Sequence, residues 1–157
     1  MNSHHTVAIG TWEGDKQQSI EYNSSIAVGI DCPRAKLRVS ILLDTIQEYQ
    51  VRYIFSDEEI SEAVNEAGLI IGARGIAYEG VLQRKPVIVV GEYGFGGLVT
   101  PDTLHEQYNN YFRGKINGIK AEYFSLERLE EIRRGFALTF QELQMMSNQT
   151  IRFLHNI

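Results

Sequence analysis

Two short apolar runs, separated by a glycine-containing loop, constrain the fold of this chain more than any other feature. The runs span residues 69–71 and 87–90, and the segment between them is about long enough for one crossover helix. Apolar runs without polar alternation are typical of buried parallel strands. Gly72 and Gly75 lie where the first strand passes to the helix, and open α/β sheets bind ligands at such carboxyl ends. The segment therefore predicts a βαβ unit and a place for a ligand.

The rest of the chain predicts strands and helices in alternation. We expect strands at 6–9, 25–30, 51–55, 69–71 and 86–90, and helices at 34–49, 56–67, 75–83, 100–112 and 125–156, with a glycine-rich loop at 91–99. Ser56 with Glu59, and Ser125, have the pattern of N-terminal caps. The alternation predicts a three-layer α/β/α, Rossmann-like domain with a mostly parallel sheet and a long C-terminal helix. One such domain fills the 157 residues, with 1–24 left unassigned apart from the first short strand.

Composition and charge exclude several classes of function. The net charge of −5 and pI of about 5.4 argue against whole-molecule attraction to nucleic acid or to anionic membranes. No apolar run approaches the length of a membrane span, and no secretory signal is visible. Cys32 is the single cysteine, which excludes an intrachain disulfide and fits a reducing compartment, so we expect a cytoplasmic protein.

Metal and nucleophile chemistry have no support in the sequence. His105 and His155 lie on predicted helices without metal-ligand spacing, and no histidine stands near Cys32. Neither a phosphate-binding P-loop nor the glycine fingerprint of dinucleotide-binding domains is present. We therefore predict no metal and no cofactor, and we identify no catalytic residue.

The loop after the strand at 69–71 is the first candidate ligand site. A helix that begins near Gly75 presents unpaired N–H groups and the positive end of its dipole, which suit a diphosphate. Arg74 can neutralise phosphate charge with a two-pronged contact. Glu79 lies one turn farther, on the side of Gly75 and Ile76, where a carboxylate can accept both ribose hydroxyls. In a simpler interpretation the glycines only turn the chain, Arg74 is solvated, and Glu79 pairs at the surface.

Two further segments are candidates for the same edge of the sheet. Gly94, Gly96 and Gly97 follow the strand at 86–90, and mobile glycine loops at strand ends often close over ligands; a permissive turn explains them equally well. Arg34 and Lys36 begin the helix after the strand at 25–30, where either a bound phosphate or a solvated first turn fits.

These segments together resemble the donor-binding half of GT-B glycosyltransferases and of the related non-hydrolysing UDP-N-acetylglucosamine 2-epimerases. The resemblance covers roughly residues 25–140. It rests on LIIGARGIAYEGVLQRKPVIVV, in which Glu79 precedes Lys85-Pro86 by the family's spacing, and on the flanking pieces SIAVGIDCPRAKLRVSILLDTI, VRYIFSDEEISEAVNEAGLII and GFGGLVTPD.

The resemblance implies a nucleotide-sugar ligand at the predicted sheet edge, and we expect it to be UDP-linked. By this analogy Glu79 holds the ribose, Gly75 and Ile76 the phosphate, and Gly96 and Gly97 the sugar. Two departures stand out: the epimerases carry Asp-Ser-Gly-Gly where this chain has GARG at 72–75, and the family's glycine before Lys85 is here an arginine. The acceptor-binding half of a GT-B enzyme has no counterpart within 157 residues, which implies a missing domain or a partner subunit.

Three interpretations of function remain open from the sequence. The first is the donor-binding domain of a glycosyltransferase, or the corresponding domain of a sugar-nucleotide epimerase. The second is a non-catalytic assembly module that keeps the fold but has lost the site, as the departures at Ala73 and Arg84 favour. It docks through its terminal helix and forms either a homo-oligomer or a complex with another protein. The third is another α/β phosphate binder of the flavodoxin or receiver type, which ranks last because no acidic pair precedes Asp31 on an earlier strand.

Overall fold

A five-stranded, mostly parallel sheet forms the centre of the protein, as the sequence predicts. The computed structural model of the chain describes residues 4–13, 16–115, 119–120, 123 and 125–155. The strand order is β4-β3-β5-β6-β7, with the first four strands parallel and β7 antiparallel to β6. The strands are β3 (Ser25–Gly29), β4 (Gln50–Tyr53), β5 (Leu69–Gly72), β6 (Val87–Gly91) and β7 (Gly94–Leu98).

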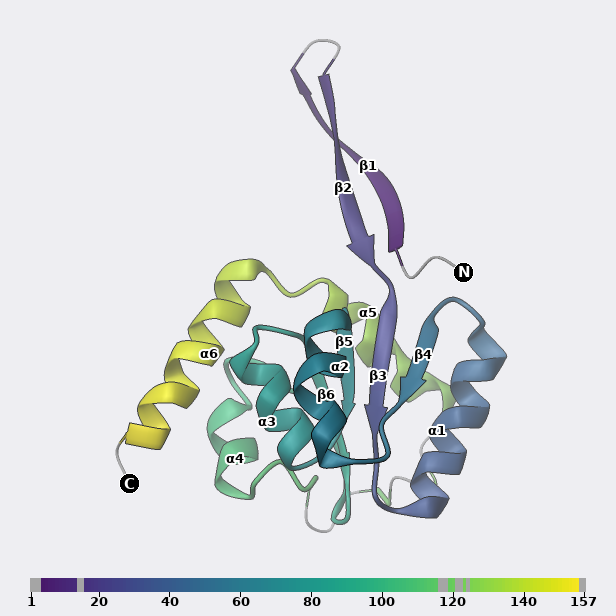
Figure 1. Cartoon of the computed structure of the whole chain (residues 1–157), viewed down its shortest axis with the longest axis vertical. Coiled ribbons are helices and arrows are strands. Elements are labelled where there is room, and N and C mark those ends of the chain that lie inside the picture. Colours follow the sequence, from purple (N-terminus) through teal and green to yellow (C-terminus); the bar gives the residue numbers. More distant parts are fainter. Residues whose placement is uncertain (1–3, 14–15, 116–118, 121–122, 124, 156–157) are drawn as a thin grey trace.

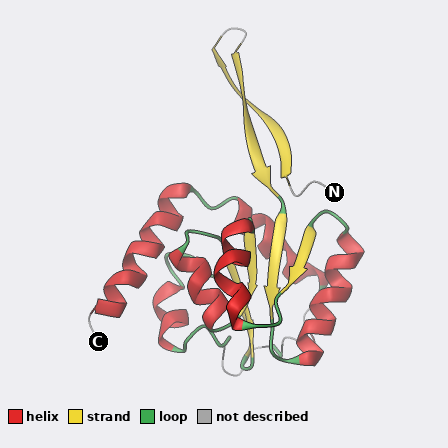
Figure 2. Ribbon diagram, in the orientation of Figure 1, coloured by secondary structure: helices red, strands yellow, loops and turns green. Residues whose placement is uncertain are grey.

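Helices cover both faces of this sheet and complete the three layers (Figures 1 and 2). The apolar cluster on one face includes residues of α1 (Pro33–Ile46) and α5 (Glu130–Phe136). The cluster on the other face includes residues of α2 (Ile60–Glu66), α3 (Gly75–Leu82), α4 (Leu104–Asn109) and α6 (Phe140–His155). Short 3-10 turns, η1 (Asp57–Glu59) and η3 (Leu126–Leu129), precede α2 and α5.

The order of the parallel strands fixes where the sheet can hold a ligand. From β3 the chain moves to β4 on one side, and from β4 it crosses to β5 on the other side of β3. Helix α1 therefore lies on one face and α2 and α3 on the opposite face. The connections diverge between β3 and β5, which makes this pair the topological switch point of a doubly wound sheet.

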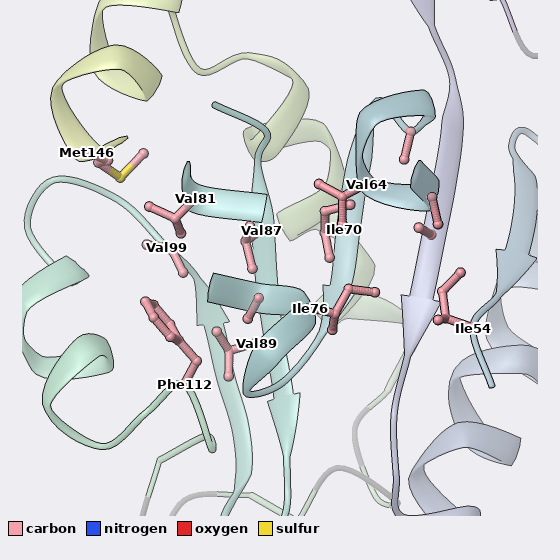
Figure 3. Close-up of a cluster of buried hydrophobic side chains, with 14 of the residues drawn as sticks. Ile54, Val64, Ile70, Ile76, Val81, Val87, Val89, Val99, Phe112 and Met146 are labelled. Atoms are coloured by element: carbon pink, nitrogen blue, oxygen red, sulfur yellow. The ribbon is translucent and has the colours of Figure 1, made fainter. Parts of the chain in front are cut away.

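Alternate residues of the buried strands fill the two cores. Ile26 and Val28 face the α1 side, whereas Ala27 and Ile70 face α2 and α3. Figure 3 shows the second cluster, in which Phe112 is completely buried beside β-strand valines. Phe112 lies in the loop after α4, so the core itself holds that loop against the sheet.

The segment predicted as a glycine-rich loop at 91–99 is instead largely a strand, and that prediction was wrong. Residues 94–98 turn back along β6, where Val90 pairs with Phe95 and Ile88 with Leu98. The alternation of Phe95 and Leu98 with glycines is too weak a pattern to identify a strand without its partner. Helix α4 also begins at Leu104, later than predicted, after a turn in which the Thr103 hydroxyl accepts the Thr100 N–H at 2.8 Å.

The single terminal helix predicted at 125–156 is divided into η3, α5 and α6. Gly135 lies against the sheet, where an added Cβ would stand 2.8 Å from Leu69 Cδ1. The chain then turns at 137–139, and Thr139 starts α6 with a reciprocal capping box: its Oγ1 accepts the Glu142 N–H at 3.1 Å and its N–H donates to Glu142 Oε1 at 3.0 Å. The hydroxyl of the predicted cap Ser56 donates to the Glu59 carboxylate and caps no backbone N–H, and Ser125 likewise makes no side-chain cap bond.

Residues before β3 form a separate two-stranded antiparallel sheet, where the sequence predicts only a short strand at 6–9. Strand β1 (His4–Glu13) pairs with β2 (Lys16–Asn23) from His4 opposite Asn23, and the register shifts between Ala8 and Trp12. Figure 1 shows this hairpin extending away from the body at the amino end of β3, opposite the carboxyl ends of the parallel strands.

The capping box of α6 gives a direct test of the helix break. Thr139→Ala removes the acceptor for the Glu142 N–H and should lower the free energy of unfolding by about 1 kcal/mol. Ser125→Ala is the matched control, because Ser125 occupies a cap position without a side-chain bond. Urea denaturation of both variants measures the difference, and equal stabilities would contradict the assignment of Thr139 as the cap.

Candidate functional site

A cleft of about 510 Å³ lies at the carboxyl ends of β3, β4 and β5, at the switch point. We call it the switch-point cleft. The carboxyl end of each strand and the residues after it line the cleft: Gly29 ends β3 and Asp31 follows it, residues 54–57 follow β4, and residues 73–76 follow β5. This is the position at which doubly wound sheets hold ligands. A smaller cavity of about 210 Å³ lies at the amino ends of β3 and β4, and we assign it no ligand.

Arg74 makes the turn from β5 into α3 in a backbone conformation that side chains seldom adopt. Its φ is 56° and its ψ is −125°. This left-handed geometry suits glycine and costs a residue with a Cβ about 1–3 kcal/mol. The Arg74 N–H donates to the carbonyl of buried Phe112 at 3.0 Å, which holds the turn in place. Strain of this kind concentrates at functional sites, so Arg74 is the first candidate there.

The two glycines that flank this turn have different roles. A Cβ on Gly72 would stand 2.4 Å from the Gly29 carbonyl oxygen and 2.6 Å from Ile76 Cγ2, so Gly72 is required by the packing of the protein itself. A Cβ on Gly75 would meet nothing closer than Ile60 Cδ1 at 3.8 Å. Gly75 is thus the glycine that leaves room at the first turn of α3, beside the cleft.

A shared carboxylate holds two guanidinium groups near the cleft. Glu92 Oε1 accepts a hydrogen bond from Arg74 Nη2 at 2.7 Å and lies 3.3 Å from Arg113 Nε. Arg113 Nη1 donates to Tyr93 Oη at 3.2 Å. The hydrogen bond from Glu92 raises the pKa of Arg74, with smaller contributions from nearby acidic groups that include Asp31. Arg74 is therefore cationic at any physiological pH.

An exposed aromatic ring stands at the rim of the cleft. Phe55 is 77% exposed and lines the cleft after β4. The ammonium of Lys36, in the first turns of α1, lies 3.9 Å from the centroid of its ring. Phe55 is not among the site residues predicted from the sequence. The available signal was an aromatic residue at the carboxyl end of the strand predicted at 51–55, directly before a polar turn.

The structure brings some of the predicted site residues together and leaves others apart. Arg74, Gly75 and Ile76 line the cleft. Lys36 is not a lining residue, but its ammonium contacts the ring of Phe55 at the rim. Glu79 is partly buried one turn along α3 and does not line the cleft. Arg34 lies in the first turn of α1 and is likewise not a lining residue.

The predicted glycine site lies within β7, where packing accounts for two of its three glycines. A Cβ on Gly94 would stand 2.5 Å from the Ile119 carbonyl oxygen, and one on Gly96 would stand 2.8 Å from Gln107 Oε1. Gly97 has a φ of 81°, which favours glycine for conformational reasons. A ligand role for these three glycines stays a prediction.

Lys85, part of the motif that carries the family resemblance, has a structural role. Its Nζ donates to the carbonyls of Asn65 at 3.1 Å and Ala67 at 2.8 Å, so it satisfies backbone acceptors at the end of α2. Burial lowers the pKa of Lys85 from its ordinary value. This side chain ties the end of α2 to the start of β6.

Comparison with known proteins leaves the family of this chain undetermined. It matches no protein-family model, no curated protein and no solved structure. Within the described residues, histidine, cysteine and acidic side chains form no group of three that could hold a metal ion. The helices of the described part lack the combination of length and apolar composition that a membrane crossing requires.

The strained turn at Arg74 predicts a variant that separates stability from binding. Arg74→Gly removes the steric cost of φ 56° and loses a half-exposed ion pair worth about 0–1 kcal/mol. We expect the free energy of unfolding to stay the same or rise by up to about 2 kcal/mol, measured by urea denaturation. A loss of stability would contradict the strain at this turn.

Proposed function

We propose that this protein is the nucleotide-sugar donor-binding domain of a glycosyltransferase, and that it holds a UDP-linked sugar in the switch-point cleft. The observation that carries the proposal is Arg74, a cationic side chain placed by a strained turn at the start of α3, in a cleft at the switch point of the sheet.

Two departures from the family's glycine motifs support the proposed relationship. Arg74 stands where the epimerase loop has a glycine, and Arg84 stands where the family has a glycine before Lys85. Both arginines have positive φ, 56° and 61°, which is the backbone region that glycine favours. The chain thus keeps the glycine-type backbone at both positions although the side chain has changed.

The first turn of α3 provides the proposed diphosphate site. Helix α3 has eight residues, and its first N–H groups and dipole favour an anion beside Gly75. Gly75 carries no Cβ, so a phosphate can approach the backbone closely. Arg74 adds a charge-assisted, two-pronged contact. These groups would stabilise the negative charge that develops on the diphosphate as it leaves the sugar.

The remaining parts of a nucleotide find partners on either side of that turn. The exposed ring of Phe55 offers a stacking surface for a base, which contributes about 1–3 kcal/mol in proteins that bind bases by stacking. We assign the ribose to Glu79, which reaches the cleft only if its side chain turns toward Gly75. Activation of the acceptor falls to a separate acceptor-binding half or partner subunit, so the chain alone binds the donor without turnover. We place this activity in the cytoplasm.

Ligand-dependent stabilisation tests the proposal. Thermal unfolding in UDP or UDP-N-acetylglucosamine at about 100 times the dissociation constant should show about 2.7 kcal/mol of added stability. UMP should stabilise less, because it lacks the second phosphate. Arg74→Gly should lose most of the ligand effect, as should Gly75→Val, which fills the space at the first turn.

Arg84→Gly is the matched control for Arg74→Gly. It removes the same positive-φ strain at an exposed position outside the cleft, so it should keep full ligand stabilisation. Glu79→Gln tests the ribose assignment on its own. No stabilisation of the parent chain by any uridine or guanosine nucleotide at millimolar concentration would overturn the proposed function.

An assembly module is the second candidate, favoured by apolar side chains exposed on α6. Phe140, Met145 and Leu154 are all exposed there. A concentration-dependent dimer in sedimentation experiments, together with no nucleotide affinity, would favour this candidate over the first.

A further inference from the structure

A second cavity adjoins the switch-point cleft, and Phe55 is not among its lining residues. Its volume is about 390 Å³, and it is lined by Arg74, Gly75, Tyr78, Tyr111 and Arg113. We call it the arginine–tyrosine cavity. It shares Arg74 and Gly75 with the switch-point cleft. A ligand whose diphosphate lies at the first turn of α3 can therefore extend into both spaces.

Two residues that line this cavity each carry a buried polar atom without a hydrogen bond. Among the described residues, two buried side-chain polar atoms make no hydrogen bond: Tyr78 Oη and Arg113 Nε. Both belong to residues that line the arginine–tyrosine cavity. Buried polar atoms without a partner are rare in folded proteins and call for an explanation such as an absent ligand. Burial, followed by the neighbouring Tyr108, raises the pKa of Tyr78 to about 12, so its hydroxyl stays protonated and able to donate.

The Glu92 carboxylate lies between the two guanidiniums, and its side chain can move away from them at little cost in free energy. Its side chain is 48% exposed, and its ion pairs with Arg74 and Arg113 are those of a partly solvated carboxylate, worth about 0–1 kcal/mol each. Its Oε1 lies 3.3 Å from Arg113 Nε but forms no hydrogen bond with it. A better-placed carboxylate can therefore replace Glu92 at little cost.

We propose that the arginine–tyrosine cavity holds the sugar of the donor, and that this sugar is acidic, a uronate whose carboxylate binds Arg113 and Arg74 in place of Glu92. This inference rests on the proposed function. The carboxylate supplies the acceptor that Arg113 Nε lacks once the Glu92 side chain has moved aside. The exposed ring of Tyr111 provides an apolar wall for the face of the sugar. A neutral sugar leaves the guanidinium of Arg113 with its present neighbours, the Glu92 carboxylate, the Tyr93 hydroxyl and the Tyr111 ring.

Matched pairs of ligands test the inference, because they differ only in the carboxylate. Calorimetric titration of the full chain compares UDP-glucuronate with UDP-glucose and UDP-galacturonate with UDP-galactose, with UDP as the reference. We expect at least one uronate to bind about tenfold or more tightly than its neutral counterpart. Arg113→Gln should reduce this ratio to near one while UDP affinity stays within about twofold.

Several variants keep the outcome interpretable. The backbone of Arg113 makes the contacts that hold its loop, including acceptance of the Tyr93 N–H at 2.9 Å, so Arg113→Gln should fold. Arg152→Gln, an exposed arginine on α6, is the charge-matched control and should leave the ratio unchanged. Glu92→Gln removes the competing carboxylate and should raise uronate affinity.

Each result has a distinct meaning. If UDP binds but neither uronate is preferred, the acidic-sugar inference is overturned and the proposed function stands. If the preference persists in Arg113→Gln, the assignment of the cavity is overturned. If UDP itself does not bind, the proposed function fails and the inference fails with it.

Discussion

The packing of Ile76 over two glycines is the contact on which the site depends. Gly29 and Gly72 pair in register at the ends of β3 and β5, both facing α3. A Cβ on Gly29 would stand 2.8 Å from Ile76 Cδ1, and one on Gly72 would stand 2.6 Å from Ile76 Cγ2. The isoleucine therefore fills the space that two side chains would otherwise occupy. Because of this contact, the first turn of α3 packs directly on the sheet at the switch point.

That close approach explains the strain at Arg74. Because Ile76 must lie on Gly72, the chain has only Ala73 and Arg74 with which to leave β5 and enter α3. The tight turn places Arg74 at φ 56°, and the carbonyl of buried Phe112 fixes its N–H. The core thus determines the conformation of a surface cation. The stability that the buried Ile76 and Phe112 contribute compensates for a strained residue beside the cleft.

The sequence predicts the parts of this fold that rest on local pattern and fails where the decisive contact is distant. The parallel strands could be predicted because their apolar runs are continuous, and the structure confirms them. The start of α3 could be predicted because Gly75 precedes residues with helical spacing. Strand β7 was missed because its pairing with β6, not its own glycine-rich sequence, makes it a strand. The break before α6 had a local signal, Thr139 followed by Glu142. The prediction missed it because apolar residues between 126 and 143 follow helical spacing on both sides of the break. Arg113 is 39 positions from Arg74, and no local rule brings the two to one carboxylate.

An acidic protein with a net charge of −5 can offer an anion site because the relevant charges are local. Arg74 and Arg113 lie at one edge of the sheet and share Glu92, so the cluster carries a single net positive charge before any ligand arrives. Long-range attraction of an anion is correspondingly weak, and recognition depends on short contacts made after the ligand enters. The shared carboxylate also keeps both guanidiniums oriented in the absence of ligand, which lowers the entropy lost on binding. Specificity at such a site depends on how well the oxygens of an incoming anion accept hydrogen bonds from both guanidiniums. Glu92 accepts one from Arg74 but none from Arg113 Nε.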